Sequence, residues 1–427
     1  MSRDRAKGRR THILCALFLA LFTIAASFSA YRKDVAQGFD ELAHASYVAS
    51  LQQSRAFWPP LETLRMLDPQ MLRFTREANY LNHPPPYYLS LAWIGPKIEG
   101  SLNALFAHRL INVLLVLAGL TAVIAVAFRL GLATLETYAY VVALLTIPVL
   151  GSLAGAINND NLAFAGGALA IFSASHLLAT GQSKWFFAAL AGAVAASFAK
   201  LTGLMLVVGF LTCVSGYLWW RGRFKRNWAL PLAIALLLAI APYLAFVAEY
   251  GSPAPNTSAH VAILTDGARK TGWAFAERLA FPAYAVRFVQ DFLAGWMPSL
   301  AERNKFHYFM LALPVAFVVC AVAGLWLSLA RMLHRSEKPL DVIVIAGWSA
   351  IIFTFVVHLI FSFERHTSTG WMLDAYPRYY LPLAATIPLA ALSLAAAIRS
   401  SRLYYWLIGF LILGPILFRV LGGPIEG

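Results

Sequence analysis

The sequence predicts an all-α polytopic membrane protein with about eleven transmembrane helices. Three observations support this fold class. Apolar runs of about twenty residues recur along the chain, each long enough to cross a hydrocarbon core about 30 Å thick. The 427 residues are 60% hydrophobic and only 13% charged, which is about half the charged fraction of a typical soluble domain. Short basic clusters stand at the ends of the apolar runs, where positive charge orients a membrane protein.

The first apolar run, residues 12–30, directly follows five basic residues within the first ten. This arrangement predicts a cytoplasmic N-terminus and a helix that emerges on the outer side of the membrane. A cleaved signal peptide is the alternative, because small residues end the run. The later predicted spans are 105–128, 137–157, 161–179, 184–199, 201–220, 228–248, 308–330, 342–362, 380–397 and 403–421.

Basic clusters at 221–226, 331–338 and 399–402 fix the predicted topology, because they are expected on the cytoplasmic side. Residues 87–94 are apolar for only eight residues, too few to cross, so we expect them to lie along the outer interface. Two long extracytoplasmic loops, 31–104 and 250–306, then extend from a single transmembrane domain that covers residues 1–427. Long loops on a compact scaffold often carry function.

The net charge of +14 does not indicate nucleic-acid binding, because the basic residues form no single patch. The three cysteines, Cys15, Cys213 and Cys320, lie inside apolar runs and are expected to be small core residues. The sequence contains no Gly-rich phosphate loop, no Cys/His metal spacing and no GxSxG motif.

Asp40 and Glu41 form an acidic pair soon after the first span, and His44 follows one helical turn later. The apolar spacing predicts a short helix that begins near Asp40. In one interpretation Asp40 caps this helix and Glu41 is favoured by the helix dipole. In the other, Asp40 is a general base at the membrane surface and His44 orients it.

Three prolines, residues 84–86, separate His83 from Tyr87 and stiffen the chain. This rigidity is expected to fix both side chains at the level of the lipid headgroups. A simple aromatic belt on a rigid loop is the alternative interpretation.

Residues 158–161 read Asn-Asn-Asp-Asn, an unusually polar turn between two apolar spans, and an ordinary hairpin turn is its simplest interpretation. Lys200 lies between two spans that have no polar linker, so it is drawn to the membrane boundary. Ionisable residues at such depth usually face a cavity or a partner. The predicted topology puts Asp160 and Lys200 on the same outer side, where they could pair with each other.

Two arginines also fall on the predicted outer side. The preference of basic residues for the cytoplasmic side does not explain their presence there. Arg109 opens an apolar span and Arg378 lies in a short late loop. Because arginine offers phosphate a forked, permanently charged donor set, Arg109, Lys200 and Arg378 are candidate ligands for a lipid phosphate. Snorkelling of these side chains toward the headgroups is the alternative.

Taken in chain order, these features resemble the GT-C superfamily of glycosyltransferases that use lipid-linked phosphosugars. The features that carry the resemblance are the acidic pair, His83-Pro84-Pro85, Arg109, Asp160, Lys200 and the Arg378-Tyr379-Tyr380 motif. They are similar to protein O-mannosyltransferases, to the aminoarabinose transferases of lipid A, and to a bacterial branch with a first-loop Asp-Glu-x-x-His motif. The resemblance covers about residues 10–220 and, beyond them, the Arg-Tyr motif.

The resemblance implies an inverting enzyme that moves a sugar from a polyprenyl-phosphate donor to a hydroxyl of a glycan, lipid or protein. The implied catalytic residues are Asp40 and Glu41. The residues implied to position the donor or acceptor are His44, His83, Tyr87 and Asp160. The residues implied to bind phosphate are Arg109, Lys200 and Arg378. The acidic motif differs from the spaced pair of metal-dependent oligosaccharyl transferases, so no cofactor is firmly implied and a divalent cation stays open.

A transporter or flippase of a lipid-linked sugar is the main alternative, because it would also explain buried charges and an aromatic belt. It predicts charges spread through the midplane along a pathway, whereas here most cluster on the outer side. A membrane polysaccharide polymerase or ligase is the third hypothesis. In each case the expected location is a bacterial inner membrane, with the site facing the periplasm.

Overall fold

A computed structural model describes residues 2–35, 38, 40–270, 278–294, 307–372, 376–398 and 400–421. Within these residues, seven helices are long and apolar enough to cross a membrane. They are α1 (Ser2–Arg32), α4 (Leu102–Arg129), α7 (Asp160–Thr180), α9 (Leu201–Trp220), α10 (Ala229–Tyr250), α13 (His307–Leu333) and α14 (Pro339–Thr369). The chain is therefore an all-α, multi-pass integral membrane protein, as the sequence predicts.

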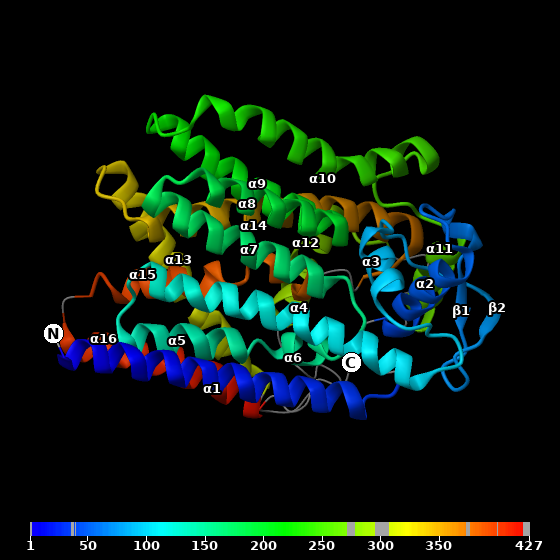
Figure 1. The fold of residues 1–427 in the computed structure, drawn as a ribbon, viewed down its shortest axis with the longest axis horizontal. Helices are drawn as coiled ribbons and strands as arrows, with labels where there is room; N and C mark the ends of the chain where they lie inside the picture. The colour runs from blue at the N-terminus through cyan, green and yellow to red at the C-terminus, as the bar shows by residue number, and fades with distance from the viewer. Residues whose placement is uncertain are drawn as a thin grey trace.

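Four further apolar helices run among these seven: α5 (Thr134–Leu145), α8 (Ser183–Ala199), α15 (Thr386–Ala395) and α16 (Ser401–Leu421), in which Ser401–Leu417 forms the short apolar stretch (Figure 1). Together these helices occupy the regions of the predicted spans. How many of them cross the membrane remains a prediction.

The remaining elements of the first predicted outer loop gather at one end of the bundle, the right-hand end in Figure 1. They are α2 (Glu41–Ser54), the 3-10 turn η1 (Leu61–Thr63), the antiparallel strands β1 (Arg65–Leu67) and β2 (Phe74–Ala78), and α3 (Pro86–Ile94). Helix α3 has only 9 residues, too few to span a bilayer. Trp93 and Ile94 at its end are 75% and 72% exposed, as expected for a helix that meets lipid at an interface.

The second predicted outer loop contains two amphipathic helices, α11 (Ser258–Lys270) and α12 (Phe281–Ala294). Helix α12 buries Tyr284 and Phe288 against Phe355 and Phe363 of α14. Residues 271–277 and 295–306 of this loop lie outside the described residues.

Two predicted spans are broken in the structure. The span at 137–157 is divided between α5 and the short helix α6 (Pro148–Ala154). Proline has no N–H and disfavours a helical residue before it, so the helix stops and restarts at Pro148. The span at 380–397 begins instead as the 3-10 segment η3 (Pro377–Leu383), which contains two prolines, before α15.

Glycines let α7 pack at backbone distance against two neighbours. A Cβ at Gly166 would lie 2.6 Å from the carbonyl oxygen of Gly192 in α8. A Cβ at Gly167 would lie 2.1 Å from the carbonyl oxygen of Pro382 in η3. Small residues permit such close helix packing in membranes. This contact holds η3 firmly against the helix that begins with Asp160.

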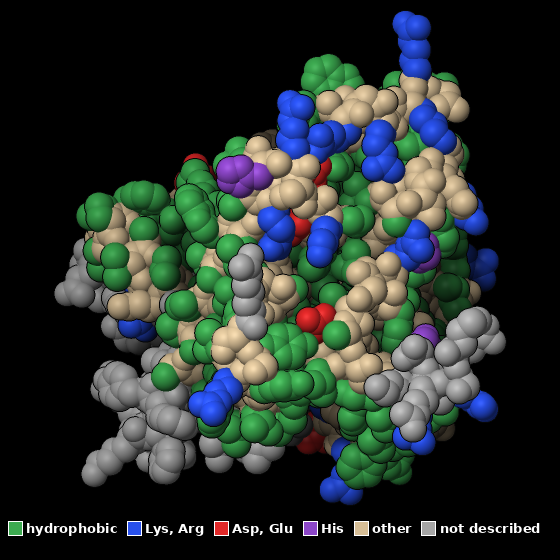
Figure 2. All heavy atoms as spheres, turned by 90° about the vertical axis from the view of Figure 1, so that its left-hand side faces the viewer, with side chains coloured by type: hydrophobic (Ala, Val, Ile, Leu, Met, Phe, Trp, Pro, Cys, Tyr) green, Lys and Arg blue, Asp and Glu red, His purple; other side chains and the backbone are tan. Residues whose placement is uncertain are grey.

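One end of the bundle carries several basic connections between helices (Figure 2). Figure 2 faces the left-hand end of Figure 1, where the α9–α10 and α13–α14 connections lie, and shows many Lys and Arg side chains there. Exposed basic residues of these connections include Arg223, Lys225, Arg226 and Arg335. The basic clusters at 221–226 and 331–338 thus share the end opposite α2 and α3, as the predicted topology requires.

Candidate active site

Asp40 directly precedes α2 and has a left-handed backbone (φ 58°, ψ 23°), which aspartate tolerates better than most residues. Asp40 is the N-cap residue of α2 and Glu41 lies in its first turn, as one interpretation predicts, but the Asp40 side chain makes no capping hydrogen bond to the helix. Instead Tyr80 Oη donates to Asp40 Oδ1 at 3.0 Å, and Arg378 Nη2 donates to Oδ2 at 3.1 Å. The Asp40 side chain is 42% exposed, so a substrate can reach it.

Arg378, in η3, connects Asp40 to a second carboxylate. Its Nε lies 3.7 Å from Asp160 Oδ2, and its guanidinium carbon lies 5.0 Å from the centre of the Tyr376 ring. The aromatic ring can favour the cation through its π face. The Arg378 side chain is 12% exposed, so it borders the opening where Asp40 lies.

Asp160 and Lys200 form a buried ion pair, in which Lys200 Nζ donates to Asp160 Oδ1. The prediction that these residues lie on the same side and pair is confirmed. Lys200 has an extended backbone at the junction of α8 and α9. Asn159 Nδ2 donates to the Ala199 carbonyl at 2.7 Å, which ties this junction to the start of α7. Lys200 Nζ also lies 3.8 Å from the centre of the Tyr379 ring.

Asp40, Arg378, Asp160 and Lys200 therefore form a row of alternating charges, here called the charge row. Burial lowers the pKa of Lys200, which lies between the spanning helices, to about 8, although the charge of Asp160 opposes this shift. The row extends from the exposed Asp40 to the buried Lys200. Ionisable groups kept at such depth are costly and usually functional.

Glu41 and Arg109 form a buried ion pair with each other. Arg109 Nε and Nη2 donate to the two Glu41 oxygens at 2.8 and 2.7 Å, and Arg109 Nη1 donates to the carbonyls of Ala30 and Lys33. The backbone N–H of Ile157 donates to Glu41 Oε1 at 3.0 Å. The Glu41 and Arg109 side chains are 0% and 4% exposed. In the structure this ion pair joins α2 to α4, and the catalytic role of Glu41 and the phosphate-binding role of Arg109 remain predictions.

His44 does not orient Asp40 either. Asn158 Nδ2 donates to His44 Nε2 at 3.1 Å, so Nδ1 carries the proton and donates to Tyr88 Oη at 2.9 Å. Burial, together with the charges of Arg378 and Lys200, holds the pKa of His44 well below its usual value. Asn158 Oδ1 also accepts the N–H of Asp160. A neutral His44 therefore supports the turn that presents Asp160.

His83 and Tyr87 differ in how near they lie to the charge row. The His83 ring stacks on His44 with 6.0 Å between ring centres, and burial and the nearby Lys200 lower its pKa. Tyr87 is buried and donates to Asn112 Oδ1 at 2.7 Å. Asn112 Oδ1 also accepts from Asn161 Nδ2 at 3.0 Å. In the structure Tyr87 thus braces α3 against α4.

Tyr80 is a site residue that sequence reasoning missed. It stands three residues before His83, in a segment whose other tyrosines attracted attention through the neighbouring prolines. Nothing in the local pattern distinguishes it, because its partner Asp40 is forty residues away in the chain. Tyr379 belongs to the Arg-Tyr motif and Tyr376 lies two residues before Arg378, but the motif does not indicate that Lys200 lies over the Tyr379 ring or Arg378 over the Tyr376 ring.

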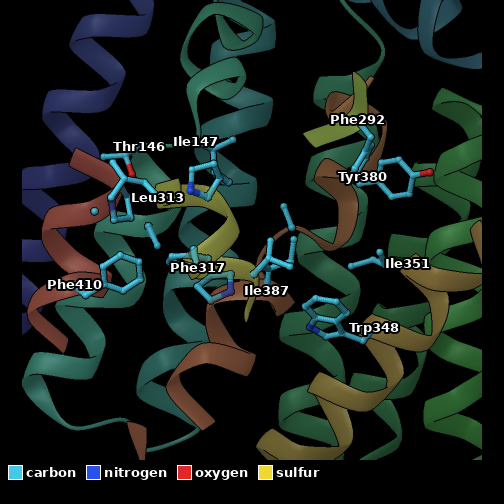
Figure 3. Close-up of a pocket in the computed structure, with 17 residues that line it drawn as sticks. Thr146, Ile147, Phe292, Leu313, Phe317, Trp348, Ile351, Tyr380, Ile387 and Phe410 are labelled. Atoms are coloured by element: carbon cyan, nitrogen blue, oxygen red, sulfur yellow. The ribbon is translucent and has the colours of Figure 1, made fainter. Parts of the chain in front are cut away.

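An apolar cavity of about 240 Å³ lies among α5, α13, α14, α15 and α16. Figure 3 shows Phe292 and Tyr380 on one side of it and Phe410 on the other. The Tyr380 hydroxyl lies 3.1 Å from His358 Nδ1. Because Tyr380 is two residues after Arg378, the cavity and the charge row share η3 as a wall.

Across the described ranges, no three His, Cys, Asp or Glu side chains come together in a group that could hold a metal ion.

The bundle of membrane helices, with a folded first loop over a charged site at one end, is the fold of a solved membrane-protein structure. The solved structure of apo ArnT from Cupriavidus metallidurans has this fold, with a TM-score of 0.50 and 15% identity over 92% of the present chain. The present chain spans 61% of that chain's length.

A second solved structure, ArnT from Cupriavidus metallidurans bound to undecaprenyl phosphate, matches with a TM-score of 0.40 and 15% identity. This match covers 95% of the present chain and 87% of that one. No protein-family model and no curated protein sequence matches the chain.

Proposed function

We propose that the protein is an inverting glycosyltransferase that moves a sugar from a polyprenyl-phosphate donor to an acceptor hydroxyl. The observation that carries the proposal is the charge row: one exposed carboxylate, Asp40, stands beside cations that suit a phosphate. The GT-C-like fold supports the same class of reaction, but the assignment rests on the geometry of the site.

In the proposed reaction, Asp40 removes the proton from the acceptor hydroxyl. The acceptor oxygen forms a bond to the anomeric carbon from the side opposite the leaving group. The bond between that carbon and the phosphate oxygen breaks, and its electron pair stays on the phosphate. The products are the glycosylated acceptor, protonated Asp40 and the polyprenyl phosphate, and the anomeric centre is inverted.

The leaving phosphate gains one negative charge in this step, so cations beside it favour the transition state. Arg378 and Lys200 supply these cations, and Arg378 can bind phosphate oxygens with two parallel hydrogen bonds. Asp160 holds Lys200 in place and keeps it charged. The apolar cavity next to Tyr380 offers the first isoprene units of the donor a place beside η3.

We place the site on the extracytoplasmic face. The basic connections at the opposite end of the bundle support this placement, because basic residues favour the cytoplasmic side. It puts the N-terminus in the cytoplasm and the folded loop at 31–104 in the periplasm of a bacterial inner membrane. The acceptor then enters from the periplasm, where Asp40 is exposed.

The test is turnover by the purified protein in liposomes, with a panel of polyprenyl-phosphate sugars and undecaprenyl phosphate as the product standard. Both released polyprenyl phosphate and movement of the intact lipid between leaflets are measured. Release of polyprenyl phosphate coupled to sugar transfer is the expected result. Movement of the intact donor without any release would contradict the proposal and favour a transporter.

A further inference from the structure

Asp40 is held by two side chains among the described residues. Tyr80 Oη donates to Oδ1 at 3.0 Å and Arg378 Nη2 donates to Oδ2 at 3.1 Å. The charge row contains two carboxylates and two cations, so its formal charge sums to zero. Before any substrate binds, the charge of Arg378 is therefore balanced by the carboxylates of Asp40 and Asp160.

A donor phosphate competes with Asp40 for Arg378. Arginine binds phosphate through paired hydrogen bonds, which are stronger and more directional than one hydrogen bond to a partly exposed carboxylate. Once Arg378 turns to the phosphate, Asp40 loses the partner on Oδ2 at the moment when it must accept a proton. That oxygen becomes free for the acceptor hydroxyl, while the contact on Oδ1 is retained.

Tyr80 is fixed independently of Arg378. The neighbouring Asn79 is buried, and its Nδ2 donates to the Ala43 carbonyl at 2.8 Å, in the first turn of the helix that Asp40 precedes. The backbone N–H of Asn79 donates to the Leu64 carbonyl at 3.0 Å. The Tyr80 carbonyl in turn lies 3.1 Å from His260 Nδ1 of α11. The backbones of Tyr80 and Asp40 are thus anchored to the same helix.

We propose that Tyr80 is the positioning residue for the base Asp40: its phenol keeps Oδ1 in place when the donor phosphate draws Arg378 away from Oδ2. This inference rests on the proposed glycosyltransferase function. Burial, reinforced by the Asp40 carboxylate, raises the pKa of Tyr80, so the phenol remains a hydrogen-bond donor over the working pH range. A hydrogen bond to a carboxylate favours its charged form, which is the form that a base needs.

Asp40 is surrounded by several other groups that can carry charge. The titratable groups that interact electrostatically with it are Tyr80, His83, Tyr88, Lys200 and Arg378. Burial holds the pKa of His83 well below its usual value and the pKa of Tyr88 well above its usual value.

The test compares Tyr80→Phe with Tyr31→Phe, which removes the same hydroxyl from a side chain that is 72% exposed. Both are assayed for sugar transfer in liposomes beside Asp40→Asn, after thermal unfolding shows equal folding. Tyr80→Phe is expected to lower kcat about 10- to 100-fold with KM changed less than about threefold. Tyr31→Phe is expected to match the wild type.

Three other results of this test would contradict either the role of Tyr80 or the proposed function. A wild-type kcat in Tyr80→Phe, while Asp40→Asn is inactive, would overturn the role of Tyr80 and leave the proposed function standing. A rise in KM alone would make Tyr80 a substrate-binding residue and overturn the positioning role. A wild-type protein without turnover on any donor would remove the proposed function, and the role of Tyr80 with it.

Discussion

The Glu41–Arg109 pair gives a sharp prediction, because sequence reasoning and structure assign it different roles. Glu41→Gln keeps the size of the side chain but removes its charge. Arg109 then stays buried with the carbonyls of Ala30 and Lys33 as partners. The amide NH₂ of the new glutamine stands where a Glu41 oxygen accepted a charge-assisted hydrogen bond from Arg109. Breaking a buried ion pair on one side typically costs about 3–5 kcal/mol, and we expect Glu41→Gln to lose about that much stability.

The assay is reversible unfolding in mixed micelles with increasing SDS, followed by far-UV circular dichroism. Glu99→Gln is the matched control, because Glu99 forms an ion pair at 2.9 Å with Lys97, whose side chain is 64% exposed, and ion pairs at the surface contribute about 0–1 kcal/mol. The double variant Glu41→Leu with Arg109→Met is expected to recover part of the loss, since it leaves no buried charge. Equal stability of Glu41→Gln and Glu99→Gln would refute the structural role of Glu41.

Three further predictions concern the charge row and its support. Because burial lowers the pKa of Lys200 to about 8, its charge is lost as pH rises through that value. Undecaprenyl phosphate should then bind more weakly above about pH 8 in calorimetric titrations, and Lys200→Arg should abolish this pH dependence. Arg378→Gln should weaken binding of the same ligand by about 10- to 100-fold, the cost of lost charge-assisted hydrogen bonds. Gly167→Ala should cost about 1–3 kcal/mol through its clash with Pro382 and lower turnover, whereas Gly216→Ala, which meets no atom within 4 Å, should change neither.

The fold class could be predicted because a membrane imposes one dominant pattern, long apolar runs with basic ends. The positions where predicted helices break could not be predicted from the sequence. Pro148 was visible in the sequence, but proline also occurs inside α10 at Pro242 and inside α13 at Pro314. Whether a proline ends a helix or only bends it depends on which neighbours satisfy the freed carbonyls, and this is a tertiary property.

Four members of the predicted site, Asp40, Asp160, Lys200 and Arg378, come together in the structure. Topology alone placed them at one end of the bundle, and charges near a membrane must find partners. Their roles remain predictions.

The partners themselves could not be read from the sequence. Glu41 is adjacent to Asp40 in the chain, yet it points to Arg109, sixty-eight positions away. The left-handed backbone at Asp40 and the helical backbone after it turn the two neighbouring side chains in different directions. The choice of which carboxylate meets Arg109 and which stays exposed is made by the docking of α4 against α2, and no local spacing encodes it.

The most direct test of the central claim is the rate of polyprenyl phosphate release by Asp40→Asn, measured beside Asp34→Asn on the donor that the wild-type protein uses best. Asp34 is an exposed residue six positions earlier in the chain, so the control makes the same chemical change near the same surface. If Asp40 is the base, Asp40→Asn should lower turnover by about 10²- to 10⁴-fold while Asp34→Asn retains the wild-type rate. Equal rates for the wild type and Asp40→Asn, at equal folding, would contradict the assignment of the active site to the charge row.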